Sequence, residues 1–156
     1  MDKELIKINL GSGWRKAEGF VNIDYREETN PDVCCDVTEG LPFPDNSVLM
    51  VRAHDFLEHI PIGQTIQVIE EIYRVLIPDG LFESFTPDCE AGQGAFQDPT
   101  HKSFWCENSW LYYSDAAHRA LYGIKANFKI NTMNRLVSDP QRRIYHLHVF
   151  ANAVKE

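Results

Sequence analysis

The pattern that most restricts the fold of this chain is a strand, a helix and a second strand within residues 47–86. Residues 48–51 are continuously apolar, which is typical of a strand buried on both faces of a sheet. The string "LFESFT" at residues 81–86 reads as a second strand. Because two strands joined through a helix run parallel in one sheet, this unit predicts an α/β fold with a mainly parallel sheet.

The segment between these strands has the clearest helical period in the chain. Its apolar residues recur every three or four positions, while charged and amide side chains fall on the other side, which predicts a helix with one buried face. Pro78 and Gly80 are expected to end this helix. The expected apolar face consists of Ile66, Ile69, Ile72, Tyr73 and Leu76.

The opening of the chain predicts two further strands that lie close together in sequence. Residues 6–10 and 20–23 have strand character, and only residues 14–19 separate the glycines after the first strand from the second. A crossover between parallel strands normally takes a dozen or more residues. We therefore expect a compact loop in place of a first helix. The alternative is that these two strands are not simple parallel neighbours.

The rest of the chain predicts a long loop, a second helix and a closing hairpin. Residues 87–105 are polar without a clear period; loops of this length are usually functional or disordered, and the aromatic residues here argue against disorder. A helix is expected over residues 108–122, ended by Gly123. Its expected buried face consists of Trp110, Tyr113, Ala117 and Leu121. Strand-like runs at 128–137 and 144–154 flank a turn and predict an antiparallel hairpin.

Composition is that of a soluble globular protein. With 156 residues, 44% apolar and 24% charged, the chain is expected to form a single domain over residues 1–156. No apolar run reaches the 18 or so residues of a membrane span, and the charged N-terminus does not read as a signal peptide. The four cysteines lack a C-x-x-C spacing, so free thiols in a reducing cytoplasm are expected.

Charge is unevenly distributed along the chain, whose net charge is −8. Residues 1–90 carry 7 Lys and Arg against 18 Asp and Glu, whereas residues 91–156 carry 8 against 5. An acidic chain is a poor general binder of nucleic acid, so no nucleic-acid partner is expected. The mildly basic last third could face an anionic small molecule, or it could be an ordinary solvated surface.

Five strings occur in an order and at spacings that resemble the class I S-adenosylmethionine-dependent methyltransferases, and in particular the type 11 group. They are "LGSG", "VNIDYR", "CDVTEGLPFPDNSV", "DFLEHIP" and "EEIYRVLIPDG", and they cover about residues 5–90. The resemblance implies a Rossmann-like, mainly parallel sheet with flanking helices and a C-terminal antiparallel β-hairpin. The sequence departs from the family pattern by lacking a third loop glycine, by Leu49 in place of a common aspartate, and by "IPDG" in place of "KPGG".

The resemblance also implies a site for S-adenosylmethionine at the carboxyl end of the sheet. Gly11 and Gly13 lack a Cβ, so the backbone can approach the cofactor closely. Asp24 is expected to accept hydrogen bonds from the ribose hydroxyls, and Asp36 to meet the adenine amino group with Val37 against the ring. The full set of expected cofactor contacts is Leu10, Gly11, Ser12, Gly13, Asp24, Tyr25, Asp36, Val37 and His54.

The candidate catalytic residues are His101 and Asp98, within the string "QDPTHKSFW". An imidazole with an ordinary pKa titrates near neutral pH and suits a general base, and Asp98 would orient it. The alternative is an Asp-Pro turn that only caps the local backbone. No metal site is expected, because His146 and His148 share a strand face but have no carboxylate or cysteine near them in sequence.

These residues predict an enzyme that transfers a methyl group from S-adenosylmethionine to a small-molecule acceptor. Methyl transfer asks the protein mainly to align donor and acceptor, since the cofactor carries the reactive group. The alternative function is a non-catalytic module of the same fold that binds S-adenosylmethionine, S-adenosylhomocysteine or a protein partner. A nucleotide-sugar or nicotinamide oxidoreductase is a third reading, which the missing Gly-x-Gly-x-x-Gly pattern disfavours.

Overall fold

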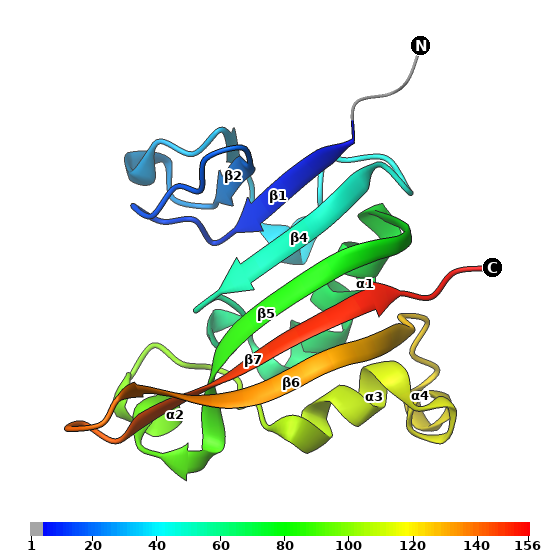
Figure 1. Cartoon of the computed structure of the whole chain (residues 1–156). Helices are drawn as coiled ribbons and strands as arrows, with labels where there is room; N and C mark the ends of the chain where they lie inside the picture. The colour runs from blue at the N-terminus through cyan, green and yellow to red at the C-terminus, as the bar shows by residue number, and fades with distance from the viewer. Residues whose placement is uncertain (1–4) are drawn as a thin grey trace.

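The computed structural model describes residues 5–156, and its centre is a seven-stranded sheet in the order β3-β2-β1-β4-β5-β7-β6 (Figure 1). All neighbouring strands run parallel except β7, which is antiparallel to both β5 and β6. This arrangement confirms the predicted Rossmann-like sheet with a C-terminal hairpin. The strands are β1 (Ile6–Leu10), β2 (Val21–Asp24), β3 (Val33–Cys34), β4 (Val48–His54), β5 (Leu76–Gly92), β6 (Phe128–Asp139) and β7 (Ile144–Ala153).

The predicted strand–helix–strand unit is present, with α1 (Thr65–Val75) between the parallel strands β4 and β5. The helix ends before Pro78, because Leu76 is already paired with Val48 of β4 as the first residue of β5. Ile69 and Ile72 are fully buried as expected, whereas Ile66 is 37% exposed. The helical period therefore identified the helix but placed its C-terminal end too late.

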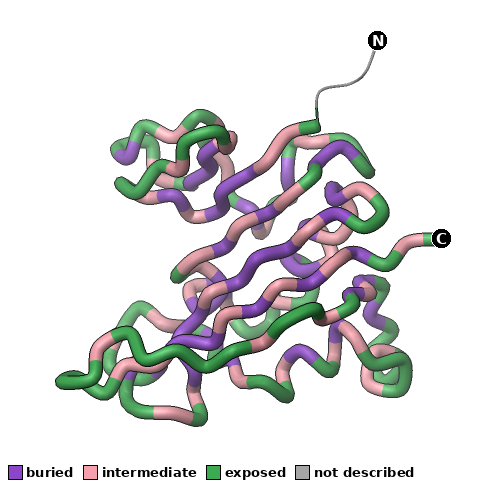
Figure 2. Tube along the Cα trace, viewed as in Figure 1, coloured by how far each residue is buried: buried purple, intermediate pink, exposed green. Residues whose placement is uncertain are grey.

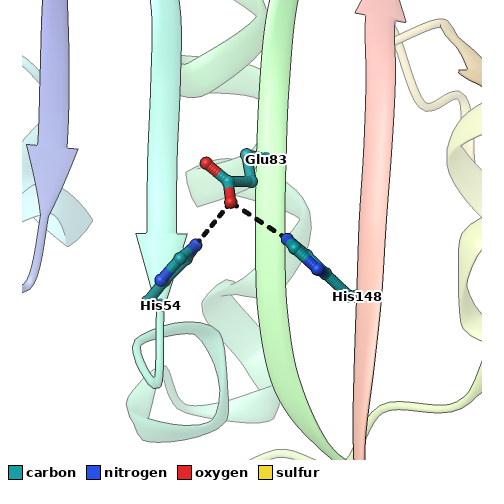
Figure 3. Close-up of side chains that lie close together, drawn as sticks. All are labelled: His54, Glu83 and His148. Atoms are coloured by element: carbon teal, nitrogen blue, oxygen red, sulfur yellow. Dashed lines mark hydrogen bonds and ion pairs between the residues drawn. The ribbon is translucent and has the colours of Figure 1, made fainter. Parts of the chain in front are cut away.

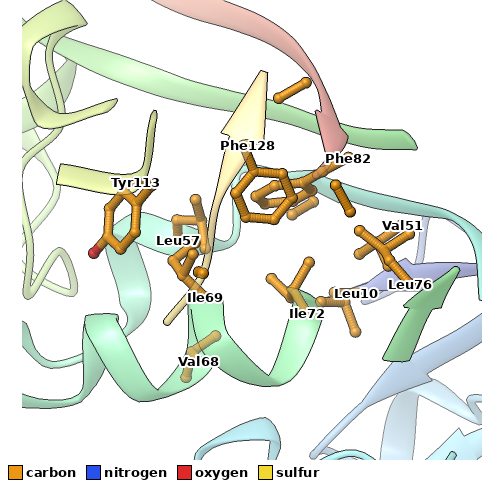
Figure 4. Close-up of a cluster of buried hydrophobic side chains, with 14 of the residues drawn as sticks. Leu10, Val51, Leu57, Val68, Ile69, Ile72, Leu76, Phe82, Tyr113 and Phe128 are labelled. Carbon is orange, nitrogen blue, oxygen red and sulfur yellow. The ribbon is translucent and has the colours of Figure 1, made fainter. Parts of the chain in front are cut away.

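One face of the sheet packs on α1 and forms the hydrophobic core (Figure 4). Alternate residues of each strand point into this core, and the strands in the middle of the sheet are the most buried part of the trace (Figure 2). Core members from β1, β4, β5 and β7 include Leu10, Val51, Phe82 and Leu147, each 0% exposed. The opposite face of the same strands carries charged and imidazole side chains.

The expected compact loop takes the place of a helix between β1 and β2, which are parallel neighbours. A buried amide holds this loop together. The Asn22 side chain accepts a hydrogen bond from the Ala17 N–H (2.7 Å) and from Asn9 Nδ2 (3.0 Å), and donates to the carbonyls of Ala17 and Phe20. The Asp32 carboxylate accepts from both the backbone N–H and the side chain of Asn22. Side chains thus supply the partners that a helix would have supplied through its backbone.

The second predicted helix is broken into three short pieces. A 3-10 turn (Glu107–Trp110) leads into α3 (Leu111–Ser114), and α4 (Ala116–Tyr122) follows after Asp115. Asp115 has extended backbone angles and its side chain caps α4 by accepting from the His118 N–H. Trp110 and Tyr113 are buried as predicted, whereas no residue of α4 is buried: Ala117 is exposed and Leu121 is 67% exposed, against the prediction. Gly123 ends α4 with φ +65°, as expected.

The segment expected as a long loop is only partly irregular. β5 continues through Pro87 to Gly92, α2 (Gly94–Gln97) follows, and residues 98–106 return across the end of the sheet. The strand continues because Gly92 still pairs with Ile144 of β7, after an irregularity in the register. The described helices include none long and apolar enough to cross a membrane.

Candidate functional site

A cleft of about 580 Å³ opens at the carboxyl ends of β1 and β4. Ligand pockets in proteins commonly have volumes of this size, and in open α/β sheets they lie at this edge. Most of the lining comes from the loop after β1 and from the last residues of β4. The lining residues are Asn9, Gly11, Ser12, Gly13, Trp14, Arg15, Lys16, Ala17, Arg52, His54, Asp55 and Phe85.

The glycine loop in this cleft has two positions that favour glycine for conformational reasons. Gly11 and Gly13 have φ values of +62° and +48°, in the left-handed region that side chains disfavour. A Cβ on Gly11 would also overlap the ring of Phe56. Ser12, between them, has a buried hydroxyl for which residues 5–156 supply no hydrogen-bond partner. The loop therefore presents mainly backbone to the cleft.

Asp24 ends β2 and fastens this loop. Its Oδ2 accepts a hydrogen bond from the Gly13 N–H at 2.8 Å, and its Oδ1 accepts from the backbone N–H of Arg26 at 2.9 Å and from Arg26 Nε at 3.3 Å. Asp24 is 5% exposed. A ribose hydroxyl that approached this carboxylate would therefore compete with the Arg26 side chain.

Of the other predicted cofactor residues, only His54 belongs to the lining of the cleft. His54 lines the cleft, while the side chains of Leu10 and Val37 belong to the core. The Asp36 carboxylate caps the 3-10 turn Val37–Glu39 by accepting from the N–H and the hydroxyl of Thr38. Tyr25 is 70% exposed. The cofactor contacts of these residues stay predictions.

Several cleft residues were not predicted from the sequence. Positive charge in the lining comes from Arg15, Lys16 and Arg52, and negative charge comes from the Asp55 carboxylate. The backbone of Asp55 has a φ of +48°, which is unusual for a residue other than glycine. The strand period of β4 offered one usable signal, because Arg52 and His54 alternate with the buried Val51 and Ala53. Their common face follows from that alternation, but the neighbours that they meet come from distant strands.

Beside the cleft, two imidazoles share one carboxylate on the polar face of the sheet (Figure 3). Glu83 Oε1 lies 2.8 Å from His54 Nε2 and 2.9 Å from His148 Nε2, while Glu83 Oε2 accepts from Arg52 Nε at 2.9 Å. Burial raises the pKa of Glu83, but the hydrogen bonds from His54, Arg52 and His148 outweigh it and lower this pKa to about 2. The carboxylate is therefore ionised and fully partnered.

His101 is not among the residues that line the cleft. Its side chain is 7% exposed, its Nδ1 lies 2.8 Å from the Ala95 carbonyl oxygen, and its Nε2 lies 3.7 Å from Asp98 Oδ2. Asp98 Oδ1 accepts hydrogen bonds from the N–H and the hydroxyl of Thr100, as in an Asp-Pro turn. The general-base role of His101 and the orienting role of Asp98 stay predictions.

His101 packs against a second group of polar residues that follows β4. Its ring meets the His59 ring edge-on, with centroids 5.1 Å apart. Glu58, next to His59, is 2% exposed, and neither of its carboxylate oxygens has a hydrogen-bond partner among the described residues. Burial, with the negative charges of Asp55 and Asp98, raises the pKa of Glu58 to about 8. No sequence pattern predicted this contact between residues 58–59 and 101.

Comparisons with known proteins agree with this geometry. Residues 15–83 match the family model described as a methyltransferase domain, type 11. A search of curated proteins finds no match. The fold matches the (4+2)-cyclase SpnF with a TM-score of 0.70 and 15% identity, over 100% of this chain and 78% of that one.

Two further solved structures have the same fold. One is a chain from the complex between the Haloferax volcanii Trm112 methyltransferase activator and a methyltransferase. It matches with a TM-score of 0.69 and 14% identity, over 100% of this chain and 85% of that one. The 1,6-didemethyltoxoflavin-N1-methyltransferase of Burkholderia thailandensis, solved with S-adenosylhomocysteine, matches with a TM-score of 0.66 and 14% identity, over 96% of this chain and 71% of that one. These comparisons confirm the resemblance to class I S-adenosylmethionine-dependent methyltransferases and support S-adenosylmethionine as the cofactor.

Proposed function

We propose that this chain binds S-adenosylmethionine in the cleft and transfers its methyl group to a small-molecule acceptor. The observation that carries the proposal is the joint between the glycine loop and the end of β2, where the Gly13 N–H donates to the Asp24 carboxylate. This joint lies at the edge of the sheet where α/β folds bind nucleoside cofactors. The family match over residues 15–83 supports the same assignment.

The residues at this edge suit such a cofactor. The backbone of Gly11 and Gly13 in the lining can meet its polar groups. The Asp24 carboxylate, bonded to the Gly13 N–H, can accept from ribose hydroxyls that displace the Arg26 side chain. Arg15 and Lys16 suit its carboxylate end. When bound, the cofactor supplies a methyl group on a positively charged sulfur. The chain's own residues then position the acceptor, and Arg52 in the lining suits an acceptor with negative charge.

The experiment is calorimetric titration of the protein with S-adenosylmethionine, S-adenosylhomocysteine and NAD. Binding of either sulfur nucleoside at one site per chain, without binding of NAD, supports the proposal. Release of S-adenosylhomocysteine in the presence of small-molecule acceptors then separates catalysis from binding alone. Binding of NAD alone would instead favour an oxidoreductase.

The predicted role of His101 is tested by the His101→Ala variant. A general base lost from the site lowers turnover far more than it lowers the affinity for S-adenosylmethionine. If His101 only braces the loop through the Ala95 carbonyl, thermal stability falls while activity per folded molecule stays near that of the wild type.

A non-catalytic or differently catalytic module is the second candidate. Its support is the match to SpnF, which is described as a (4+2)-cyclase and so has an activity other than methyl transfer on the same fold. The match to a complex that contains a methyltransferase activator supports a protein partner as a further option. Sulfur-nucleoside binding without any methyl transfer would favour this candidate.

A further inference from the structure

The Glu58 carboxylate has an unusual environment for a buried acidic group. The residue is 2% exposed and both of its oxygens lack a hydrogen-bond partner among the described residues. Buried carboxylates in proteins are normally paired with a cation, hydrogen-bonded or bound to a metal ion. The charged groups that act on Glu58 are Asp55 and Asp98, which are both negative. These side chains therefore add to the negative potential around Glu58 instead of neutralising it.

The hydrogen bonds of His59 and His101, the two imidazoles next to Glu58, determine which ring nitrogen of each carries the proton in the neutral form. The Nδ1 atom of His101 lies 2.8 Å from a carbonyl oxygen, that of Ala95, so Nδ1 carries the proton. The hydroxyl of Thr100 donates its only hydrogen to Asp98, so at 3.3 Å it can only accept from His59 Nδ1. In its neutral form, each ring therefore has an unprotonated Nε2 with a lone pair. Metal-binding histidines typically hold their second nitrogen in this way.

The backbone fixes the two segments against each other. The N–H groups of Lys102 and Ser103 both donate to the Glu58 carbonyl, at 2.7 and 3.1 Å, and the Ser103 hydroxyl donates to the Leu57 carbonyl. One possible donor atom from each of Glu58, His59 and His101 lies within 4.8 Å of the other two. Two donors on one tetrahedral zinc ion lie about 3.4 Å apart, as follows from bond lengths of about 2.1 Å. Binding of an ion therefore requires the three side chains to rotate towards one another.

We propose that Glu58, His59 and His101 form a binding site for one divalent transition-metal ion, of the class of Zn²⁺, Mn²⁺ or Fe²⁺. Two imidazoles and one carboxylate are a ligand set for these ions that leaves coordination positions open. The proposal revises the expectation of no metal and gives His101 a role other than general base, because a bound Nε2 has no lone pair for a proton. It does not depend on methyl transfer. Glu58 follows three residues after Asp55, which lines the cleft.

A second group of two histidines and a glutamate serves as the matched control. His54, Glu83 and His148 also offer three donors within 4.8 Å. There, however, both Glu83 oxygens already have partners, and one partner is the Arg52 guanidinium at 2.9 Å. A fixed positive charge next to a carboxylate opposes a bound cation. This group is therefore complete without a metal.

The test is calorimetric titration of untagged, chelator-treated protein with Zn²⁺ and with Mn²⁺. We expect one site per chain, and affinities at least about tenfold weaker in Glu58→Gln, His59→Gln and His101→Ala. The His54→Ala control should bind as the wild type does. Titration without S-adenosylmethionine keeps this result separate from the proposed methyl transfer.

Three results would overturn the assignment: no stoichiometric binding of either ion, binding that the three ligand variants leave unchanged, or binding that His54→Ala abolishes. A measurement on the wild-type protein keeps the proposal testable if a ligand variant fails to fold. In histidine-selective NMR, Zn²⁺ should shift the Cε1–H signals of His59 and His101 and leave that of the half-exposed His118 in place. Shifts confined to His54 and His148 would place the ion in the control group and contradict the proposal.

Discussion

The Gly13 N–H donates a 2.8 Å hydrogen bond to the Asp24 carboxylate, which joins the loop after β1 to the end of β2. The same carboxylate accepts from the backbone and the side chain of Arg26. One buried side chain therefore sets the position of the backbone that faces the cleft. The loop can be short because this bond replaces the support of a following helix.

Removal of this carboxylate is expected to weaken cofactor binding. Asp24→Ala should cost about 1–3 kcal/mol in the free energy of S-adenosylmethionine binding, since charge-assisted hydrogen bonds are lost. Calorimetry measures the change against Glu18→Ala, which removes an exposed carboxylate from the same loop and should bind normally. An unchanged dissociation constant in Asp24→Ala would remove Asp24 from the site. Arg26→Ala removes the side-chain bond to Asp24 Oδ1 but keeps the backbone N–H bond, and it should bind at least as tightly as the wild type.

The buried Asn22 amide should be a main source of stability for the compact loop. Asn22→Ala leaves the Ala17 N–H and the Asn9 side chain without their acceptor, so we expect a loss of about 1–3 kcal/mol in the free energy of unfolding. Urea denaturation followed by circular dichroism measures this loss. Asn134→Ala, at an exposed position of β6, is the matched control and should change stability little. Equal stability of the two variants would contradict the role given to this network.

Gly11 should tolerate no side chain, for two separate reasons. Its φ of +62° disfavours alanine by about 1–2 kcal/mol, and a Cβ there would overlap the Phe56 ring. Gly11→Ala is therefore expected to lower the unfolding temperature, whereas Gly63→Ala, with no heavy atom near the added Cβ, should leave it unchanged or slightly higher. The double variant with Phe56→Ala tests the steric part. The double variant should recover only the part of the lost unfolding temperature that the overlap with the Phe56 ring causes. Full recovery of the unfolding temperature would show that backbone strain contributes nothing.

The elements with a strong local pattern were predictable from the sequence. The period of residues 66–76 identified α1, and two strand-like runs on either side of a turn identified the hairpin. The break at Asp115 was not predictable, because it depends on a side-chain cap within a segment of ordinary helical composition. The loop glycines were interpreted through the cofactor, whereas the contact with Phe56, which also requires Gly11, could not be predicted from the sequence.

The polar clusters were harder to predict, because their members meet only after folding. His54, Glu83 and His148 come from three neighbouring strands that are far apart in sequence. His146 and His148 suggested a shared face, but the carboxylate of that face comes from β5. Similarly, Glu58 and His59 meet His101 only because residues 102 and 103 bind the Glu58 carbonyl. Local sequence spacing therefore indicates candidate members of such groups, whereas the partners of these members depend on the tertiary fold.

The ionised Glu83 should make stability fall in acid. Burial raises the pKa of Glu83, but the stronger hydrogen bonds from His54, Arg52 and His148 lower it from 4.5 to about 2. A carboxyl group whose pKa is lower in the folded state stabilises above its unfolded pKa, and this contribution is lost as the pH falls from about 5 towards 2. In Glu83→Gln we expect a smaller free energy of unfolding at pH 6 and a difference from the wild type that shrinks towards pH 2. Urea denaturation at a series of pH values measures this difference, with Glu18→Gln as an exposed control that should follow the wild type. A difference that stayed constant between pH 6 and pH 2 would show that the charge of Glu83 does not stabilise the sheet.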